Sequence, residues 1–345
     1  MSTPQTLFIY ESLTAGAYRQ AHQNSSLLAE GRMMAEAVIA DFAALDAFQV
    51  VTVWGSRLRR PRQPRLKTYV AESCQEEQSY FRQCCEQADR ILIVTPESQD
   101  TLRNALRAAR TINPEGVTNV SGEALDIGCD KWKLSQFCED QGIAHPQTEL
   151  WTGQAHHQPP VLLKPRDGAG CEGIRIVHEP PIPDDIDTDG RMIIQPLLPG
   201  VALSSAACFS SAGKRMLTLP LGEQQLKFTD SVEYEGGRIP WEDPMRDAAE
   251  SQAERIWEIL GRELTGLRGY VGIDWLWDNE PQTLRLVELN PRLTTSYIGY
   301  RKLFGRQIAE AMLERPLSPD ASHIRNVQFA ANPETVLPLP GEERT

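Results

Sequence analysis

The sequence has no long apolar run, no excess of positive charge and no paired-cysteine motif. No stretch of its 345 residues approaches the length of a membrane span, and residues 1–5 lack the basic region and apolar core of a signal peptide. We therefore expect a cytoplasmic protein with no membrane partner. The net charge of −12 argues against a nucleic-acid partner, which would require a basic face. An anionic ligand would have to be held by a few local lysines and arginines.

The seven cysteines also argue against two kinds of site. Their number is odd, and none stands in a C-x-x-C spacing with further Cys or His ligands. Reduced thiols of a cytosolic protein are expected rather than disulfides or a zinc site. Cys171 differs from the others because it falls in a glycine-rich loop, although the sequence assigns it no role.

Strands and helices alternate in the first third of the chain, which predicts a parallel sheet covered on both faces. The predicted α/β domain spans residues 1–117 and ends at the turn of residues 113–116. The loop after its first strand contains Glu11 and lies where such sheets bind ligands. Predicted strands are 7–10, 50–54 and 91–94, and predicted helices are 31–48, 76–88 and 98–110, the last capped by Ser98.

Strands dominate after a helix that Asp130 and Lys131 open and that runs to about Gln141. A long amphipathic helix follows from Asp243 to Leu264, and a last helix is expected over residues 299–314. The fold class is therefore α/β followed by α+β.

A predicted hairpin near the C-terminus carries the residues that most resemble a metal site. The apolar run 270–277 and the run 284–287 flank the turn of residues 278–281. Period-two alternation places Glu288 and Asn290 on one face, and the hairpin would bring Asp274 beside them. Two carboxylates and an amide oxygen suit Mg²⁺, and Arg292 just beyond could grip a phosphate. Singly, each is more often a solvated polar residue.

A glycine-rich loop between two predicted strands is the second candidate site. Gly168, Gly170 and Gly173 fit G-x-G-x-x-G, but a dinucleotide fingerprint must open a helix, and no G-K-[ST] closes a Walker A loop. Such a loop can instead fold over phosphates and offer backbone N–H groups, with Lys164 at the end of the preceding strand. The alternative is a flexible hairpin tip with a surface lysine.

In their order along the chain, these motifs resemble those of the ATP-grasp superfamily of carboxylate-amine ligases. The resemblance covers about residues 119–315 and adds the segment of residues 194–197 to the motifs above. It implies an N-terminal pre-ATP-grasp (Rossmann-like) domain followed by a two-subdomain ATP-grasp fold that clasps ATP. The implied divisions are 1–117, a lid subdomain at 118–190, a core subdomain with the metal site at 191–315, and an irregular tail at 316–345.

The resemblance also implies roles for individual residues. Lys131 and Lys164 would contact the phosphates of ATP, and Arg292 would face the transferring phosphoryl group. Asp274, Glu288 and Asn290 would hold two Mg²⁺ ions, for which Mn²⁺ could substitute. The nucleotide-binding set comprises Lys131, Lys164, Gly168, Gly170, Gly173, Gln195, Pro196, Leu197, Leu198 and Lys227.

Shorter motifs are similar to a narrower group, the tyramine-glutamate ligases of methanofuran synthesis. They are residues 10–11, 30–34, 41–42, 95–97 and 294–299. The similarity implies a ligase that joins the two small molecules tyramine and L-glutamate, and it allows a homodimer. For the substrates, Glu11 is a candidate for an ammonium group, and Arg301 or Thr294, Thr295 and Ser296 are candidates for a carboxylate.

Three other functions remain open from the sequence. One is another ATP-grasp ligase that makes a dipeptide or uses a different amine. A second is an ATP-binding regulatory protein without turnover, against which the intact set of Lys, Asp, Glu, Asn and Arg argues. A protein kinase is disfavoured because no H-R-D or D-F-G motif occurs.

Overall fold

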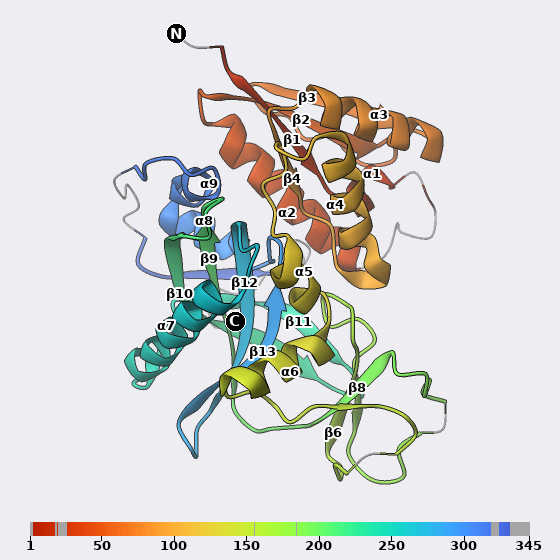
Figure 1. Ribbon diagram of the computed structural model, residues 1–345, viewed down its shortest axis with the longest axis vertical. Coiled ribbons are helices and arrows are strands. Elements are labelled where there is room, and N and C mark those ends of the chain that lie inside the picture. Colours follow the sequence, from red (N-terminus) through yellow and green to blue (C-terminus); the bar gives the residue numbers. More distant parts are fainter. Residues whose placement is uncertain are drawn as a thin grey trace, which may run out of the picture.

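The computed structural model describes residues 3–17, 19, 26–154, 156–183, 185–318 and 324–331. It contains a parallel sheet, a large antiparallel sheet and a small antiparallel sheet, which follow one another down the long axis of the molecule (Figure 1). No helix among the described residues is both long and apolar enough to cross a membrane.

The N-terminal domain is built on a four-stranded parallel sheet in the order β3-β2-β1-β4. Alternate residues of its strands pack on opposite faces, with Leu7 and Ile9 against α2 and with Phe8 and Tyr10 toward α3 and α4. This domain confirms the predicted alternation. Its elements are β1 Gln5–Tyr10, α1 Ser12–Ala15, α2 Ser26–Ala43, β2 Phe48–Gly55, β3 Leu66–Ala71, α3 Cys74–Gln87, β4 Arg90–Ile93 and α4 Thr101–Ile112.

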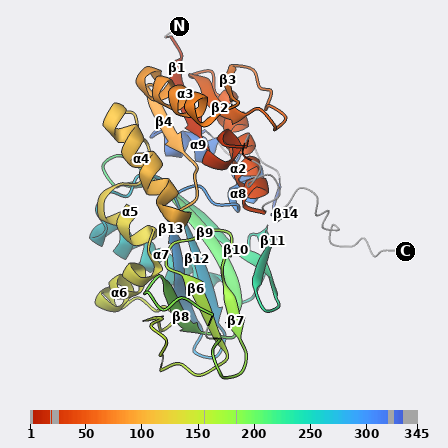
Figure 2. The same cartoon turned by 90° about the vertical axis from the view of Figure 1, so that its right-hand side faces the viewer.

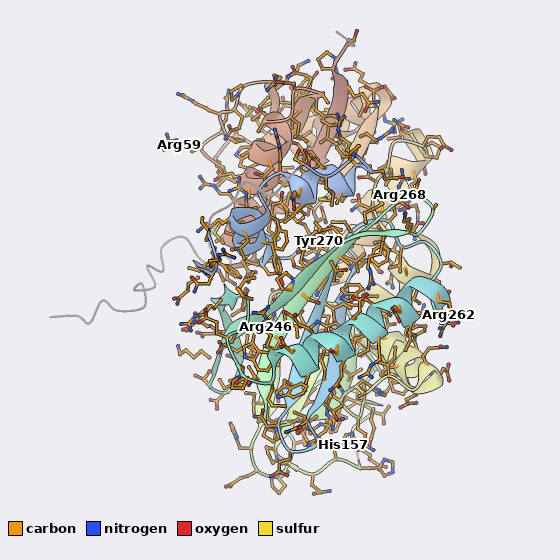
Figure 3. The ribbon with its side chains drawn as sticks, turned by 90° about the vertical axis from the view of Figure 1, so that its left-hand side faces the viewer. Arg59, His157, Arg246, Arg262, Arg268 and Tyr270 are labelled. Carbon is orange, nitrogen blue, oxygen red and sulfur yellow. The ribbon has the colours of Figure 1, made fainter. Side chains whose placement is uncertain are left out.

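A six-stranded sheet in the order β13-β12-β9-β10-β11-β14 forms the centre of the molecule. The helices α5, α6 and α7 pack on one face, where Trp257 of α7 contacts Trp275 of β12. Figure 3 shows α7 crossing this face between Arg246 and Arg262. The elements are α5 Gly122–Gly128, α6 Lys131–Gln141, β9 Val201–Phe209, β10 Arg215–Phe228, β11 Val232–Ile239, α7 Arg246–Glu263, β12 Gly269–Asp278, β13 Thr283–Asn290, α8 Tyr297–Phe304, α9 Gln307–Met312 and β14 Val327–Ala330.

The small sheet carries the glycine-rich loop. Its order is β5-β8-β6-β7, and the loop of residues 166–174 joins β6 to β7. In Figure 2 this sheet lies at the end of the molecule opposite the N-terminal domain. The strands are β5 Glu149–Leu150, β6 Val161–Pro165, β7 Arg175–Val177 and β8 Met192–Pro196.

One apolar core joins the N-terminal domain to the central sheet. It combines Phe42 of α2 with Tyr297 of α8 and Cys208 of β9, all almost fully buried. At its edge, Asp41 accepts hydrogen bonds from the Tyr297 hydroxyl at 2.5 Å and from Arg301 at 2.9 and 2.5 Å. The two halves of the chain are therefore held by a shared core and a charged network.

Several local predictions were wrong. Ser98 does not cap α4, because a short 3₁₀ turn at Ser98–Asp100 precedes a helix that begins at Thr101. The single last helix is two helices, separated at Gly305, which has a φ of +53°. Strand β3 was not predicted from the sequence. It pairs with β2 and forms one edge of the sheet.

Two of the predicted divisions cut through observed structure. The division at residue 190 precedes β8, which pairs with β6 in the small sheet. The tail predicted as irregular contains β14, which pairs with β11, whereas residues 319–323 and 332–345 lie outside the described residues. Strands of four or five residues carry too little apolar alternation for the sequence to reveal which strands they pair with.

Candidate active site

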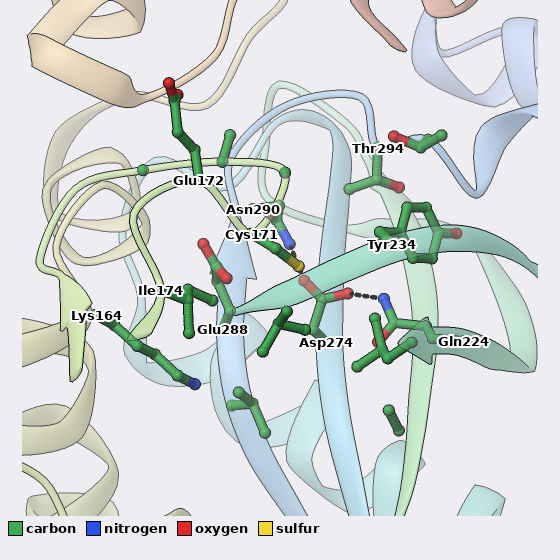
Figure 4. Close-up of a pocket in the computed structure, with 18 of the residues that line it drawn as sticks. Lys164, Cys171, Glu172, Ile174, Gln224, Tyr234, Asp274, Glu288, Asn290 and Thr294 are labelled. Atoms are coloured by element: carbon green, nitrogen blue, oxygen red, sulfur yellow. Dashed lines mark hydrogen bonds between the residues drawn. The ribbon is translucent and has the colours of Figure 1, made fainter. Parts of the chain in front are cut away.

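The predicted hairpin forms and brings the three candidate metal ligands together. Asp274 on β12 pairs directly with Glu288 on β13, and Asn290 lies opposite Gly272. The Asn290 amide nitrogen donates to Asp274 at 2.9 Å, and Gln224 of β10 donates to the other Asp274 oxygen at 2.7 Å. Figure 4 shows these side chains converging between the strands. The convergence inferred from period-two alternation is therefore confirmed.

The charges of this cluster suit a hard cation. Burial, followed by the neighbouring Glu288 carboxylate, raises the pKa of Asp274 to about 6. A divalent ion between the two carboxylates would remove that repulsion and satisfy oxygens that face each other. Asn290 presents its nitrogen to Asp274 here, so its amide would turn over to ligate through oxygen. No group of three His, Cys, Asp or Glu residues suited to a metal occurs among the described residues.

Lys131 and Lys164 approach the same carboxylates from the other side of the cleft. The Lys131 ammonium lies 2.9 Å from Glu288 and donates to the Gly168 carbonyl at 3.1 Å. Burial lowers its pKa, but the charge and hydrogen bond of Glu288, together with the charges of Glu97 and Asp167, outweigh burial and raise the pKa overall. Lys164 is buried and lines the same pocket as Glu288 (Figure 4); burial lowers its pKa, and the charge of Glu288 opposes that shift. Two cations therefore border the candidate metal site.

The start of α6 places Lys131 and anchors the glycine-rich loop. Asp130 caps the helix by accepting the backbone N–H groups of Trp132 and Lys133 at 3.0 and 3.3 Å. It also pairs with Arg166 at 2.5 Å, and the Lys131 N–H donates to the Arg166 carbonyl at 2.9 Å. Asp130 thus positions both Lys131, a candidate phosphate-binding residue, and the base of the glycine-rich loop.

The glycine-rich loop lies over the cleft and reaches the N-terminal domain. Gly170 and Gly173 have φ values of +63° and +73°, which L-residues rarely adopt. The Asp167 carboxylate accepts the Gln99 N–H at 2.9 Å, and a Cβ on Gly170 would lie 3.4 Å from Glu30. Cys171, whose sulfur points toward Asp274 in Figure 4, has its pKa raised to about 12 by burial. The loop is therefore a cover shared by two domains.

Residues 195–198, which belong to the implied nucleotide-binding set, border the same cleft. Gln195 is buried and donates to the Thr148 hydroxyl at 2.9 Å, so its side chain braces β8. The Leu197 N–H donates to the Pro160 carbonyl at 2.9 Å and is already committed. Residues 195–198 line the cleft with Lys131, Lys164, Gly168, Gly170, Asp274, Glu288, Asn290, Arg292, Thr294, Thr295 and Ser296.

Arg292 is held by a residue that the sequence did not reveal as part of the site. Its Nε donates to Glu97 at 2.7 Å, and its Nη1 donates to the Leu293 carbonyl at 2.9 Å. Both partners of the ion pair are almost fully buried, and the second Glu97 oxygen has no hydrogen-bond partner among the described residues. Glu97 follows β4 of the N-terminal domain, at the carboxyl edge of the parallel sheet where a ligand-facing residue can be sought.

Four candidate residues are not among those that line the cleft: Gly173 of the glycine-rich loop, Lys227, Arg301 and Glu11. Lys227 is half exposed and pairs with Glu233 at 3.2 Å, and Arg301 pairs with Asp41. Glu11 caps α1 by accepting the N–H groups of Leu13 and Thr14 at 3.0 and 2.7 Å. These contacts give Lys227, Arg301 and Glu11 structural roles, and the predicted ligand roles of all four residues remain predictions.

Comparison with known protein families identifies both halves of the chain. A model of the pre ATP-grasp 3 domain matches residues 48–118, and a model of the ATP-grasp domain matches residues 129–296. The chain therefore consists of a pre-ATP-grasp domain followed by an ATP-grasp domain, which confirms the predicted fold class. The chain belongs to the ATP-grasp superfamily.

Solved structures share the fold at low sequence identity. A protein from Archaeoglobus fulgidus assigned to the ATP-grasp superfamily has a TM-score of 0.68 at 20% identity, over 93% of this chain and 91% of that one. The L-amino acid ligase of Bacillus licheniformis has a TM-score of 0.63 at 12% identity, over 92% and 76%. Biotin carboxylase of Campylobacter jejuni has a TM-score of 0.65 at 15% identity, over 92% and 72%. A search of curated proteins finds no match.

Proposed function

We propose that this protein is an ATP-dependent ligase that joins a carboxylate to an amine through an acyl phosphate, with release of ADP and phosphate. The observation that carries the proposal is the convergence of two lysines, two carboxylates, an asparagine and an arginine on one cleft beneath a glycine-rich loop. The L-amino acid ligase and the carboxylase found among the structural relatives use the same fold, which supports this class of reaction.

The chain's own residues account for the demands of that chemistry. A carboxylate resists an amine because oxide is a poor leaving group, whereas an acyl phosphate loses phosphate readily. Phosphoryl transfer mainly requires position and charge neutralisation. Lys131 and Lys164 would neutralise the phosphates, and Arg292, oriented by Glu97, would face the transferring group. The loop over the cleft would exclude water, which would otherwise hydrolyse the intermediate.

The donor set around Asp274 fits Mg²⁺, as argued above. Asp274, Glu288 and Asn290 would hold the metal, and Mg²⁺ would supply charge neutralisation at the phosphate oxygens of ATP. Gln224 keeps one Asp274 oxygen oriented, so the chain prepares part of this site in advance.

Tyramine and L-glutamate are the proposed substrate pair. Support comes from the short motifs at residues 10–11, 30–34 and 95–97, because the structure draws Glu30 and Glu97 from two of them toward the cleft. Another ATP-grasp ligase would share the catalytic residues and differ in the N-terminal residues that border the cleft.

The test is ADP release by the purified protein with Mg²⁺ and ATP across a grid of carboxylates and amines that includes L-glutamate with tyramine. We expect release that requires both substrates and an amide product detected by mass spectrometry. Glu288→Gln should abolish release, whereas Glu258→Gln, on the exposed side of α7, should retain it. ATP binding without release from any pair would instead indicate a regulatory protein, and release with a different pair would replace the substrate assignment.

A further inference from the structure

Beyond Lys131 and Lys164, the candidate phosphate-binding residues, the cleft is bordered by a wall made by the N-terminal domain. This wall comprises Leu13 of α1, Leu27, Glu30 and Met34 of α2, and Val94 after β4. The same cleft is lined by Thr294, Thr295 and Ser296, which follow the hairpin of β12 and β13. We call these five N-terminal residues the α2 wall. A substrate placed against the α2 wall would contact both domains at once.

Glu30 is the charged residue of the α2 wall. Only 7% of its surface is exposed, and its Oε2 accepts a hydrogen bond from the Thr295 hydroxyl at 2.8 Å. Among the described residues it forms no ion pair with a lysine, arginine or histidine. Burial raises its pKa, while the Thr295 hydrogen bond and the charge of Arg292 act in the opposite direction. A buried carboxylate without an ion-pair partner costs free energy, and a cationic ligand in contact with it would offset that cost.

The remainder of the wall indicates what kind of molecule carries the cation. Leu13, Leu27 and Met34 offer apolar surface, which favours an apolar body over a second charged group. Lys131 and Arg292 are already paired with other carboxylates of the cleft, Glu288 and Glu97, although the charge of Arg292 also reaches Glu30. A ligand with an extra carboxylate beside Glu30 would thus meet like charge and find no free cation in the α2 wall.

The glycine-rich loop closes this part of the cleft. Gly170 lies against both Leu27 and Glu30, so close that a Cβ on Gly170 would meet them at 3.3 and 3.4 Å. A ligand beside Glu30 would therefore be covered by the same loop that covers the phosphate site. In that low-dielectric setting, a charge-assisted hydrogen bond to Glu30 would be strong and selective.

We propose that Glu30 binds the ammonium group of the amine substrate, whose apolar body packs against the α2 wall. The assignment rests on the proposed ligase function for its biological meaning, but it describes a binding site that can be tested without turnover. It makes Glu30, rather than Glu11, the residue that selects an amine.

The experiment measures binding to the full chain by calorimetry in the presence of Mg²⁺ and a non-hydrolysable ATP analogue. The probes are phenethylamine and its neutral counterpart 2-phenylethanol, which share an apolar body and differ in the ammonium group. We expect the wild-type protein to prefer the amine by at least about tenfold. Glu30→Gln should abolish that preference while its affinity for the ATP analogue stays unchanged.

A matched control is Glu36→Gln, which makes the same change on the exposed side of α2, where Glu36 pairs with Arg32 at 2.8 Å. The control should keep the wild-type preference. Equal binding of amine and alcohol by the wild type, or an unchanged preference in Glu30→Gln, would overturn the proposal. So would a Glu30-dependent preference confined to L-glutamate over glutarate, which would assign Glu30 to an amino acid. Amine preference without ADP release would refute only the ligase.

Discussion

At the residue scale, the ion pair between Arg292 and Glu97 links the two domains inside the cleft. The pair joins residues 195 positions apart and is almost fully buried. Arg292 lies between carboxylates of both domains, since the charges of Glu97, Glu288 and Glu30 all raise its pKa against the opposing effect of burial. Its guanidinium is therefore positioned by the N-terminal domain as much as by the segment that follows β13.

The first prediction concerns this positioning. In Glu97→Gln the amide can still accept from Arg292 but no longer fixes it by charge, so we expect kcat to fall about 10- to 100-fold. The KM for ATP should change less than threefold, because Lys131 and Lys164 remain. Steady-state ADP release gives both constants, and Glu86→Gln on exposed α3 is the control. A rise in KM with kcat intact would contradict the positioning role.

The second prediction concerns the free energy of unfolding and pH. Burial raises the pKa of Glu30 above its ordinary value of 4.5, so the folded state binds more protons than the unfolded state between the two pKa values. The favourable contribution of Glu30 is therefore complete below about pH 4.5 and is lost as pH rises through the folded-state pKa. Without ligand, Glu30→Gln should melt higher than the wild type at pH 7, and the gain should shrink toward pH 4.

Thermal melts from pH 4 to 8 test this prediction. Glu36→Gln should show no such pH-dependent gain, because its side chain is half exposed and paired with Arg32. A Glu30→Gln variant that melts lower than the wild type at every pH would show that the negative charge stabilises the fold instead.

The residues that could be predicted differ from those that could not in how far apart they lie in the chain. Asp274, Glu288 and Asn290 belong to one hairpin, so period-two alternation and a turn were enough to bring them together. Glu97 and Glu30 reach the site only through the docking of the N-terminal domain on the central sheet. No local periodicity encodes that docking. Glu11, the candidate that the sequence offers for an ammonium group, caps α1.

At the scale of elements, the glycine-rich loop depends on backbone conformations that side chains oppose. Strand, loop and strand were predicted, whereas contacts of the loop with Gln99 and Glu30 were not. Its hydrogen bonds run to α6 on one side and to the N-terminal domain on the other. The sequence shows the glycines but not the surfaces that the loop covers.

The third prediction separates backbone strain from closure of the loop. Gly173 has a φ of +73°, and a Cβ there would lie 2.9 Å from Pro165, whereas Gly213 has the same φ with nothing within 4 Å. Either glycine replaced by alanine should cost about 1–2 kcal/mol of stability. Only Gly173→Ala should also raise the KM for ATP, by about 5- to 30-fold. Melting temperatures and ADP-release kinetics check this, and equal KM values for both variants would contradict it.

At the scale of the whole molecule, the shared core makes the two halves one unit of folding. Leu7 and Phe42 of the N-terminal domain lie in the same core as Tyr297 and Ile308, which follow the ATP-grasp motifs. The site sits where these halves meet, so the stability of their junction and the geometry of the cleft are coupled. The order of motifs predicted the two domains, but not that helices α8 and α9 fasten them.

The fourth prediction tests this junction through Asp41, which accepts hydrogen bonds from Tyr297 and Arg301 and is largely buried. Asp41→Ala leaves the Arg301 charge and the Tyr297 hydroxyl without their partner, which should cost about 2–4 kcal/mol. Asp46→Ala removes an exposed partner of Arg65 on the same domain and should cost less than about 1 kcal/mol. In differential scanning calorimetry we expect one transition for all three proteins, shifted down markedly only in Asp41→Ala. A shared core cannot melt in one domain while the other retains it, which is why one transition is expected. Two separate transitions would show that the halves unfold independently and would contradict this prediction.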